Sequence, residues 1–146
     1  MEDEFAGKSR EYYLARTTLV WEMLRELFSL LPIVVGLPDL RADDSESVGE
    51  AVDAVHHARE ELLPLQGIPA ITESLIAEGA LEMLHALLMV THTEQFELTD
   101  WHAELWFRCL KRVEFMCGRA ITSIHLLEKQ SEILRTDEEE PPENQE

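Results

Sequence analysis

The sequence predicts an all-α protein: an antiparallel four-helix bundle with a long C-terminal helix, which we expect to dimerise. Four segments carry apolar residues three or four positions apart, the spacing of one face of a helix. The prolines fall at the ends of these segments or between them, so none interrupts a helix. The one strand-like run, Ile33–Val35, has no partner strand elsewhere in the sequence, and it is therefore expected in a loop.

Size and charge limit the classes of protein to which the chain can belong. It has 146 residues, 45% of them hydrophobic, which suits one domain with a single core. We expect a flexible lead over residues 1–8, the helical-bundle domain over 9–135 and a disordered acidic tail over 136–146. The formal net charge of −18 argues against nucleic acid and against anionic membranes as partners. If the partner is a protein, the acidic charge of the chain favours a basic one.

The two cysteines and the N-terminus bear on the compartment. Cys109 and Cys117 lie on one predicted helix, too far apart to bridge each other within it. We interpret them as reduced core residues, which indicates a reducing compartment. Met1–Phe5 is acidic and lacks the features of a signal peptide, and the most apolar run, Gly79–Val90, is too short to span a bilayer. The protein is therefore expected to be cytoplasmic.

The first helix is predicted from Ser9, a good N-cap, to about Leu31, where Pro32 stops it. Its inward-facing residues are Tyr13, Thr17, Val20, Trp21, Leu24, Leu27, Phe28 and Leu31. The next segment, Pro32–Asp44, contains helix-breaking residues between apolar ones. We expect it to be a loop that packs over one end of the bundle.

The second helix is predicted to begin at Ser45 or Ser47 and to end at Pro64. Ser47 and Glu50 have the spacing of a capping box, in which each residue bonds to the backbone of the other. The apolar stripe is narrow and consists of Val48, Val52, Val55 and Leu62. Such a helix is expected at the edge of a bundle.

The third helix, about Pro69–Thr91, is apolar nearly all round. One face consists of Ile76, Gly79, Ala80, Met83, Leu87 and Val90, and the other of Ala77, Leu81, Leu84 and Leu88. A helix of this kind is buried on most sides, and we expect no helix of a lone four-helix bundle to be buried in this way. The second face therefore predicts contact with another chain. A polar loop, His92–Leu98, is expected to follow.

The fourth helix is predicted over Thr99–Arg135, with Thr99 as its N-cap and a length of roughly 55 Å at ~1.5 Å per residue. Its core stripe consists of Trp106, Leu110, Val113, Cys117, Ala120, Ile124, Leu127 and Leu134. A second stripe on the far side consists of Trp101, Arg108, Arg112, Phe115, Arg119 and Leu126. Aromatic residues and arginines without lysine or glutamate are typical of a protein interface. Alternatively, Trp101 and Phe115 cover grooves of the bundle while the arginines pair with glutamates of the other helices.

These patterns favour a non-enzymatic interaction or assembly protein that acts as a homodimer. The expected interface residues are Trp101, Arg108, Arg112, Phe115, Arg119, Leu126, Leu81, Leu84 and Leu88. Half of the basic residues lie on the fourth helix, so this helix is complementary in charge to the acidic remainder of the chain or of a second copy. One alternative is an acidic inhibitor of the immunity type, which would bind a basic partner through the first two helices. No catalytic, cofactor-binding or metal residue is assigned.

A metal-binding enzyme is a second alternative. Glu82 and His85 have the Glu-x-x-His spacing of carboxylate-bridged di-metal bundles, because three residues bring both ligands to one helix face. Glu78 lies one turn earlier and His92 lies further along the same strip. Such a site also needs a second pair on a facing helix, and the remaining cluster, His56, His57 and Glu60, does not repeat the spacing.

A ribonuclease is the third alternative. Arg119 and His125 are separated by five residues, a spacing that resembles the Arg-x(4–6)-His motif of HEPN-type ribonucleases, which are also small helical bundles. The resemblance implies that the arginine and the histidine act on the RNA backbone across a dimer. Ala120 stands where that family usually has a polar residue. Arg108 and Lys111 could add to a local basic patch, against the acidic charge of the whole chain.

Overall fold

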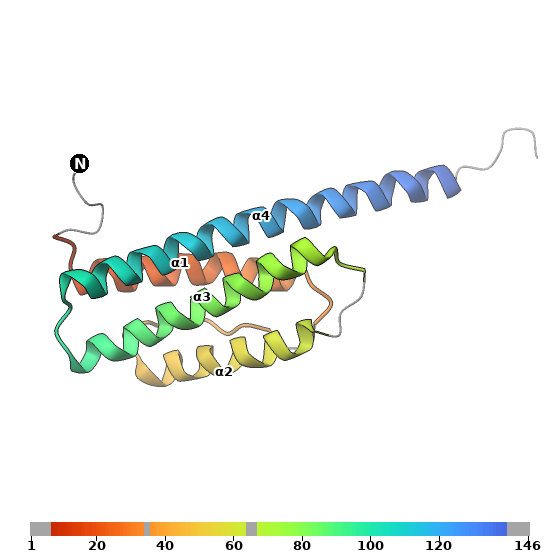
Figure 1. Ribbon diagram of the computed structural model, residues 1–146. Helices are drawn as coiled ribbons and strands as arrows, with labels where there is room; N and C mark the ends of the chain where they lie inside the picture. The colour runs from red at the N-terminus through yellow and green to blue at the C-terminus, as the bar shows by residue number, and fades with distance from the viewer. Residues whose placement is uncertain (1–6, 34–35, 64–66, 140–146) are drawn as a thin grey trace, which may run out of the picture.

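The computed structural model describes residues 7–33, 36–63 and 67–139. These residues form four helices, and no strand occurs among them (Figure 1). The helices are α1 (Arg10–Ser29), α2 (Ser45–Leu62), α3 (Ala70–Gln95) and α4 (Asp100–Glu139). The predicted all-α class is therefore confirmed. The expected lead at residues 1–6 and the end of the expected tail at residues 140–146 lie outside the described residues.

The N-termini of α1 and α2 are capped by side chains. The Oγ of Ser9 accepts a hydrogen bond from the backbone N–H of Tyr12 at 3.3 Å, as expected for an N-cap. Asp44 caps α2 in place of the expected serines, since its carboxylate accepts from the N–H of Glu46 at 3.0 Å. The Oγ of Ser47 instead accepts from the N–H of Arg41 at 2.8 Å, which ties the preceding loop to the helix. The predicted capping box is therefore wrong.

Both C-terminal helices are longer than predicted. α3 continues to Gln95, so most of the expected polar loop is helical and only a short turn leads to α4. Thr99 caps α4, its Oγ1 accepting from the N–H of His102 at 3.3 Å. The helix then continues past the predicted end at Arg135 to Glu139, into the segment expected to be a disordered tail. The side chain of Leu134, assigned to the core stripe, lies outside the described residues.

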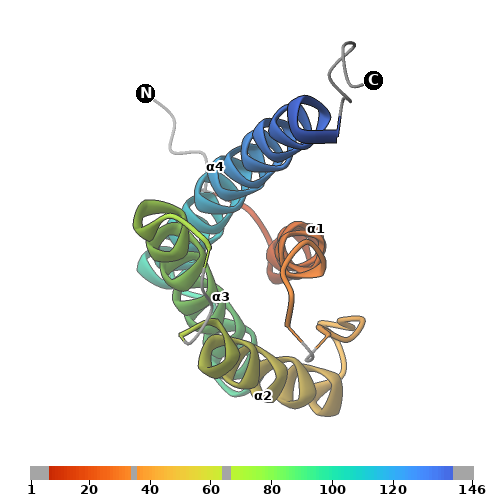
Figure 2. The same ribbon diagram turned by 90° about the vertical axis from the view of Figure 1, so that its right-hand side faces the viewer.

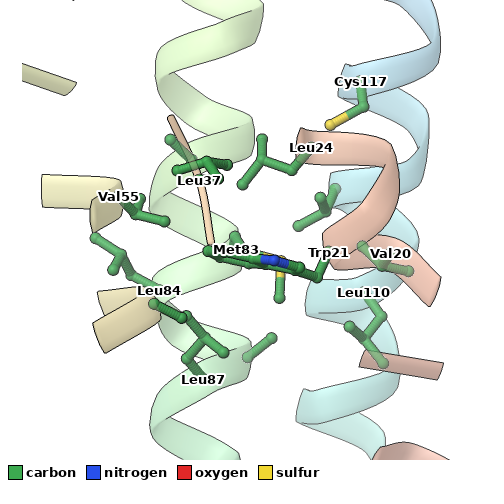
Figure 3. Close-up of a cluster of buried hydrophobic side chains, with 14 of the residues drawn as sticks. Val20, Trp21, Leu24, Leu37, Val55, Met83, Leu84, Leu87, Leu110 and Cys117 are labelled. Carbon is green, nitrogen blue, oxygen red and sulfur yellow. The ribbon is translucent and has the colours of Figure 1, made fainter. Parts of the chain in front are cut away.

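Helix α3 occupies the centre of the fold and packs against all three other helices. Figure 2 looks along the helices and shows α4, α3 and α2 as a curved row, with α1 on its concave side. One chain therefore covers much of this apolar helix, but Leu81 and Leu88 of its second face remain exposed. Leu84 is 6% exposed, and Figure 3 shows it beside Val55 of α2. It belongs to the core, not to the exposed surface predicted for it.

The helices do not alternate in direction as predicted. Arg10, at the start of α1, donates hydrogen bonds to the Oγ1 of Thr93 at 2.9 Å and to the carbonyl of Val90 at 3.1 Å, near the end of α3. At the other end of α1, Leu30 lines the same pocket as Ile124 of α4. The chain colours in Figure 1 show the same course: α3 runs opposite to the other three helices, and α1 runs the same way as α2 and α4.

The α1–α2 connection makes this arrangement possible, because it returns along the side of the bundle. The indole Nε1 of Trp21, in the middle of α1, donates to the carbonyl of Pro38 at 2.8 Å. The Nε of Arg25 donates to the carbonyl of Leu37 at 2.9 Å. Leu37 and Leu40 are buried in the main hydrophobic cluster. The expected position over one end of the bundle is therefore wrong: this segment closes the flank between α1 and α2.

Large aromatic side chains fill the centre of the core. Trp21, Trp106 and Tyr13 are completely buried, and Figure 3 shows Trp21 beside Met83 of α3. The indole Nε1 of Trp106 donates to the Oγ1 of Thr17 at 2.9 Å, and that hydroxyl donates to the carbonyl of Tyr13 at 2.7 Å. Buried polar groups are stable only when they are paired, so this chain of hydrogen bonds fixes α1 against α4.

Helix α3 is long and apolar enough to cross a membrane, judged by length and composition. The run Gly79–Val90, which was expected to be too short to span a bilayer, is part of this longer helix. Half of its most apolar window is buried inside the protein. The buried core helix of a soluble protein meets the same criterion.

The hydrogen bond between α1 and α4 gives a first prediction. Thr17→Val keeps the side-chain shape but leaves the buried indole N–H of Trp106 without an acceptor, which should reduce the free energy of unfolding by about 1–3 kcal/mol. Thr18→Val is the matched control, since its hydroxyl bonds to the carbonyl of Leu14 on its own helix. Urea denaturation followed by circular dichroism measures both. Equal effects of the two changes would contradict the role given to Thr17.

Candidate functional site

Exposed apolar and arginine side chains gather on the outer side of α3 and α4. We name this surface the α3/α4 face, and its residues are Leu81, Leu88, Trp101, Leu105, Arg108, Arg112, Phe115, Arg119 and Leu126. All of the predicted interface residues except Leu84 are therefore exposed. Leu105 was missed, although it continues the same spacing between Trp101 and Arg108.

The arginines of this face have partners within the chain. Arg108 donates two hydrogen bonds to Glu104, one turn earlier on α4, with the shorter at 2.9 Å. Arg112 pairs with Glu82 of α3 at 3.4 Å. The guanidinium of Arg119 lies 5.5 Å from the centre of the Phe115 ring. Of these contacts, only that of Arg112 joins an arginine to a glutamate of another helix, as the alternative interpretation expected.

A groove of about 430 Å³ lies between α3 and α4 within this face, which supplies Leu88, Leu105, Arg108 and Arg112 to its lining. It is lined by Glu82, His85, Leu88, Met89, Leu105, Arg108, Cys109 and Arg112. Apolar walls with a few polar groups that converge are the usual composition of a ligand site. The groove is therefore the strongest candidate for binding chemistry in the described part of the chain.

Three side chains in the groove carry atoms that can ligate a metal. Glu82 and His85 lie one turn apart on α3, and Cys109 reaches them from α4. Their ligand atoms all lie within 4.8 Å of one another. The spacing of Glu82 and His85 was recognised in the sequence, but Cys109 was assigned to the core. The Glu78 and His92 of the predicted strip are not part of this cluster.

Burial controls the charge of the two thiols. Cys109 is 4% exposed, and burial raises its pKa to about 12, assisted by a hydrogen bond to the Glu82 carboxylate and by the negative charge of that group. Burial alone raises the pKa of Cys117 to about 12. Both side chains are free thiols, as predicted. At neutral pH they are protonated and make poor nucleophiles.

An aromatic cluster at the α3–α4 turn positions Trp101. The ring centres of Trp101 and His102 are 3.9 Å apart, and those of His102 and His92 are 4.6 Å apart. Phe96 stacks on the other side of His92 at 4.8 Å. The Nε2 atom of His92 is buried without a hydrogen-bond partner. His92 and Phe96 were expected in a polar loop, so the sequence did not indicate their contact with the start of α4, where the cluster holds one end of the α3/α4 face.

The residues of the ribonuclease-like spacing point to different sides of α4. Six positions turn a helix by roughly 240°, so the side chains of Arg119 and His125 diverge. Arg119 lies over Phe115, while the Nδ1 of His125 is 3.5 Å from Glu128. Within one chain the structure does not bring the two together.

The second histidine cluster is dispersed along α2. His56 and Glu60 line a shallow pocket between α2 and α3. The ring of His57 bonds to the carbonyl of Asp53 on its own helix at 2.9 Å. These residues do not converge on a common point.

No protein family, no curated protein and no solved structure matches this chain.

The raised thiol pKa values predict that stability falls at alkaline pH. Unfolded thiols lose their protons near pH 9, whereas the folded protein retains them, so the unfolded state is increasingly favoured between about pH 9 and 12. Each thiol should lower the free energy of unfolding by up to about 1.4 kcal/mol per pH unit there. Urea titrations at pH 8 and pH 10.5 measure this dependence. The double variant Cys109→Ala/Cys117→Ala should lose less stability over that interval, and an equal loss would contradict the pKa assignment.

Proposed function

We propose that the chain is a non-enzymatic assembly protein that forms a homodimer through the α3/α4 face. The observation that carries this proposal is the run of exposed aromatic and leucine side chains along α4, continued by Leu81 and Leu88 of α3. Phe115 and Trp101 are each more than half exposed, and the guanidinium of Arg119 lies over the ring of Phe115. Aromatic residues and arginine are the types most enriched at the centres of protein interfaces.

The dimensions of the face suit a dimer. From Trp101 to Leu126 it extends roughly 37 Å along α4 at ~1.5 Å per residue. Two packed helices about 9 Å apart present a width of roughly 19 Å with their side chains. The product, about 700 Å², is close to the ~800 Å² that each partner buries in an interface of standard size.

The charge distribution favours a second copy of the chain as the partner. Arg108, Arg112 and Arg119 lie on the face of a protein whose net charge is −18. Exposed acidic residues such as Glu78 border the same face on α3. In a two-fold dimer each arginine strip can meet the acidic edge of the other copy. The exposed pair of Arg108 and Glu104 contributes little, so Arg108 can exchange this partner at small cost.

A basic protein partner is the second candidate, favoured by the outer side of α2. This helix packs mainly on α3, and its outer side carries the exposed acids Glu46, Glu50, Asp53 and Glu60. Such a surface attracts a basic protein and accelerates its association. It lies apart from the α3/α4 face, so the two candidates predict different sensitive residues.

Self-association should depend on the face and not on exposed apolar residues elsewhere. Phe115→Glu should raise the dimer dissociation constant by more than roughly tenfold, because it removes an aromatic anchor and adds a charge. Leu19→Glu is the matched control, since Leu19 on α1 and Phe115 are both 61% exposed. Sedimentation velocity at 1–100 μM measures the dissociation constants. A parent protein that stays monomeric throughout this range would contradict the proposed homodimer.

The arginine strip should contribute through charge. The double variant Arg108→Glu/Arg112→Glu should weaken the dimer, whereas Arg41→Glu, on the α1–α2 connection, should leave it unchanged. Added salt should weaken the parent dimer in the same measurement, because screening reduces charge complementarity. If Glu50→Lys/Asp53→Lys on α2 abolishes capture of a basic partner while dimerisation persists, the acidic side of α2 has a separate role.

A further inference from the structure

The groove between α3 and α4 brings together a carboxylate, an imidazole and a thiol. We propose that Glu82, His85 and Cys109 bind a zinc ion through three protein ligands and leave one coordination position open. This inference goes beyond the proposed assembly function and does not rest on it. No other group of three such side chains converges in this way within residues 7–33, 36–63 and 67–139.

The ligand types select the metal. Thiolate sulfur and imidazole nitrogen suit zinc, and carboxylate oxygen completes the common set of zinc ligands. Magnesium and calcium prefer oxygen ligands alone and do not fit this set. In a tetrahedral site with bonds of about 2.0–2.3 Å, neighbouring ligand atoms are about 3.5 Å apart. The present separations of up to 4.8 Å reach that value with side-chain movements of about 1 Å.

The contacts of Glu82 leave one of its oxygens suited to a metal. Oε1 pairs with Arg112 at 3.4 Å, whereas Oε2 lies 3.7 Å from the Nδ1 of His85. Oε2 can therefore ligate while Arg112 keeps its contact and orients the carboxylate, as outer partners do in metal sites. The Glu82 side chain is only 15% exposed, so a bound cation would neutralise a charge that is largely removed from water.

The sulfur atom of Cys109 lies within 4.8 Å of the ligand atoms of Glu82 and His85. On binding, the S–H bond breaks, a zinc–sulfur bond forms and the proton passes to solvent, without any change of oxidation state. The ligands are held by α3 and α4, the pair of helices with the most extensive packing in the fold. Ligands on packed helices keep their geometry better than ligands on loops.

The open position faces the groove of about 430 Å³. Its walls are apolar at Leu88 and Leu105, and Arg108 stands at its edge. Three protein ligands and an exchangeable fourth are typical of zinc sites that bind a water molecule or an anionic group. A structural zinc site would have its fourth ligand from the protein. The geometry therefore favours a site with an exchangeable ligand.

Cobalt(II) tests the site in the full-length protein, because it takes zinc positions and absorbs light. Cobalt(II) added to reduced parent protein should produce thiolate-to-cobalt charge-transfer absorption and the intense visible bands of a tetrahedral complex, and zinc should displace both. Cys109→Ala should lose the charge-transfer absorption entirely. Cys117→Ala is the matched control, since Cys117 lies on the same helix, is also buried and is absent from the cluster. It should keep the parent spectrum.

A second pair of variants tests the histidine without disturbing the core. His85 is half exposed, and His85→Ala should weaken cobalt binding at least tenfold. His125→Ala is its control, because His125 and Glu128 form a similar pair, 3.5 Å apart, without a cysteine. Phe115→Glu should bind the metal as the parent does, which separates this site from dimerisation. A parent protein without charge-transfer absorption, or a His85→Ala variant with unchanged affinity, would overturn the proposal.

Discussion

The apolar circumference of α3 is the constraint on which the rest of the fold depends. A helix with apolar residues on both faces loses stability wherever water reaches it, so the other elements must cover it. α4 packs along its greatest length, and α1 and α2 cover other sides. A Cβ at Gly79 would lie 3.5 Å from the Cβ of Met116, an ordinary van der Waals contact, so α4 packs directly on α3 at this position. Leu81 and Leu88 remain uncovered, and they adjoin the arginines and aromatics of α4.

Local features could be predicted from the sequence because they depend on neighbours in the chain. The helical spacing of apolar residues identified all four helices. The core stripe of α1 is buried, and that of α4 is buried from Trp106 to Ile124, whereas Leu127 is only partly buried. The N-caps Ser9 and Thr99 were recognised from residue type. The cap of α2 was not, because Ser47 has a competing backbone donor in Arg41, and no local pattern indicates which of several polar residues takes the cap.

Features that depend on distant parts of the chain could not be predicted. Periodicity shows that Leu84 belongs to an apolar face, but not that α2 covers it. The same limit applies to Cys109, which was interpreted as a core residue, while its neighbours in the cluster, Glu82 and His85, belong to another helix. The direction of α1 follows from hydrogen bonds to Pro38 and Leu37 in the α1–α2 connection. Hydrogen bonds to two backbone carbonyls in a segment without regular structure produce no recognisable pattern in the sequence.

The pairing of α1 with α4 has a consequence for the order in which the chain can fold during synthesis. α2 and α3 are consecutive and joined by a short connection, so their contacts become available as soon as α3 has left the ribosome. The hydrogen bond between Thr17 and Trp106 cannot form until Trp106, 89 residues later in the chain, has been made. Until then the buried face of α1 has no α4 to cover it, and closing so long a loop is slow. Of the four helices, α1 is thus made first and its packing is completed last, which leaves its aromatic residues accessible to chaperones until α4 has been made.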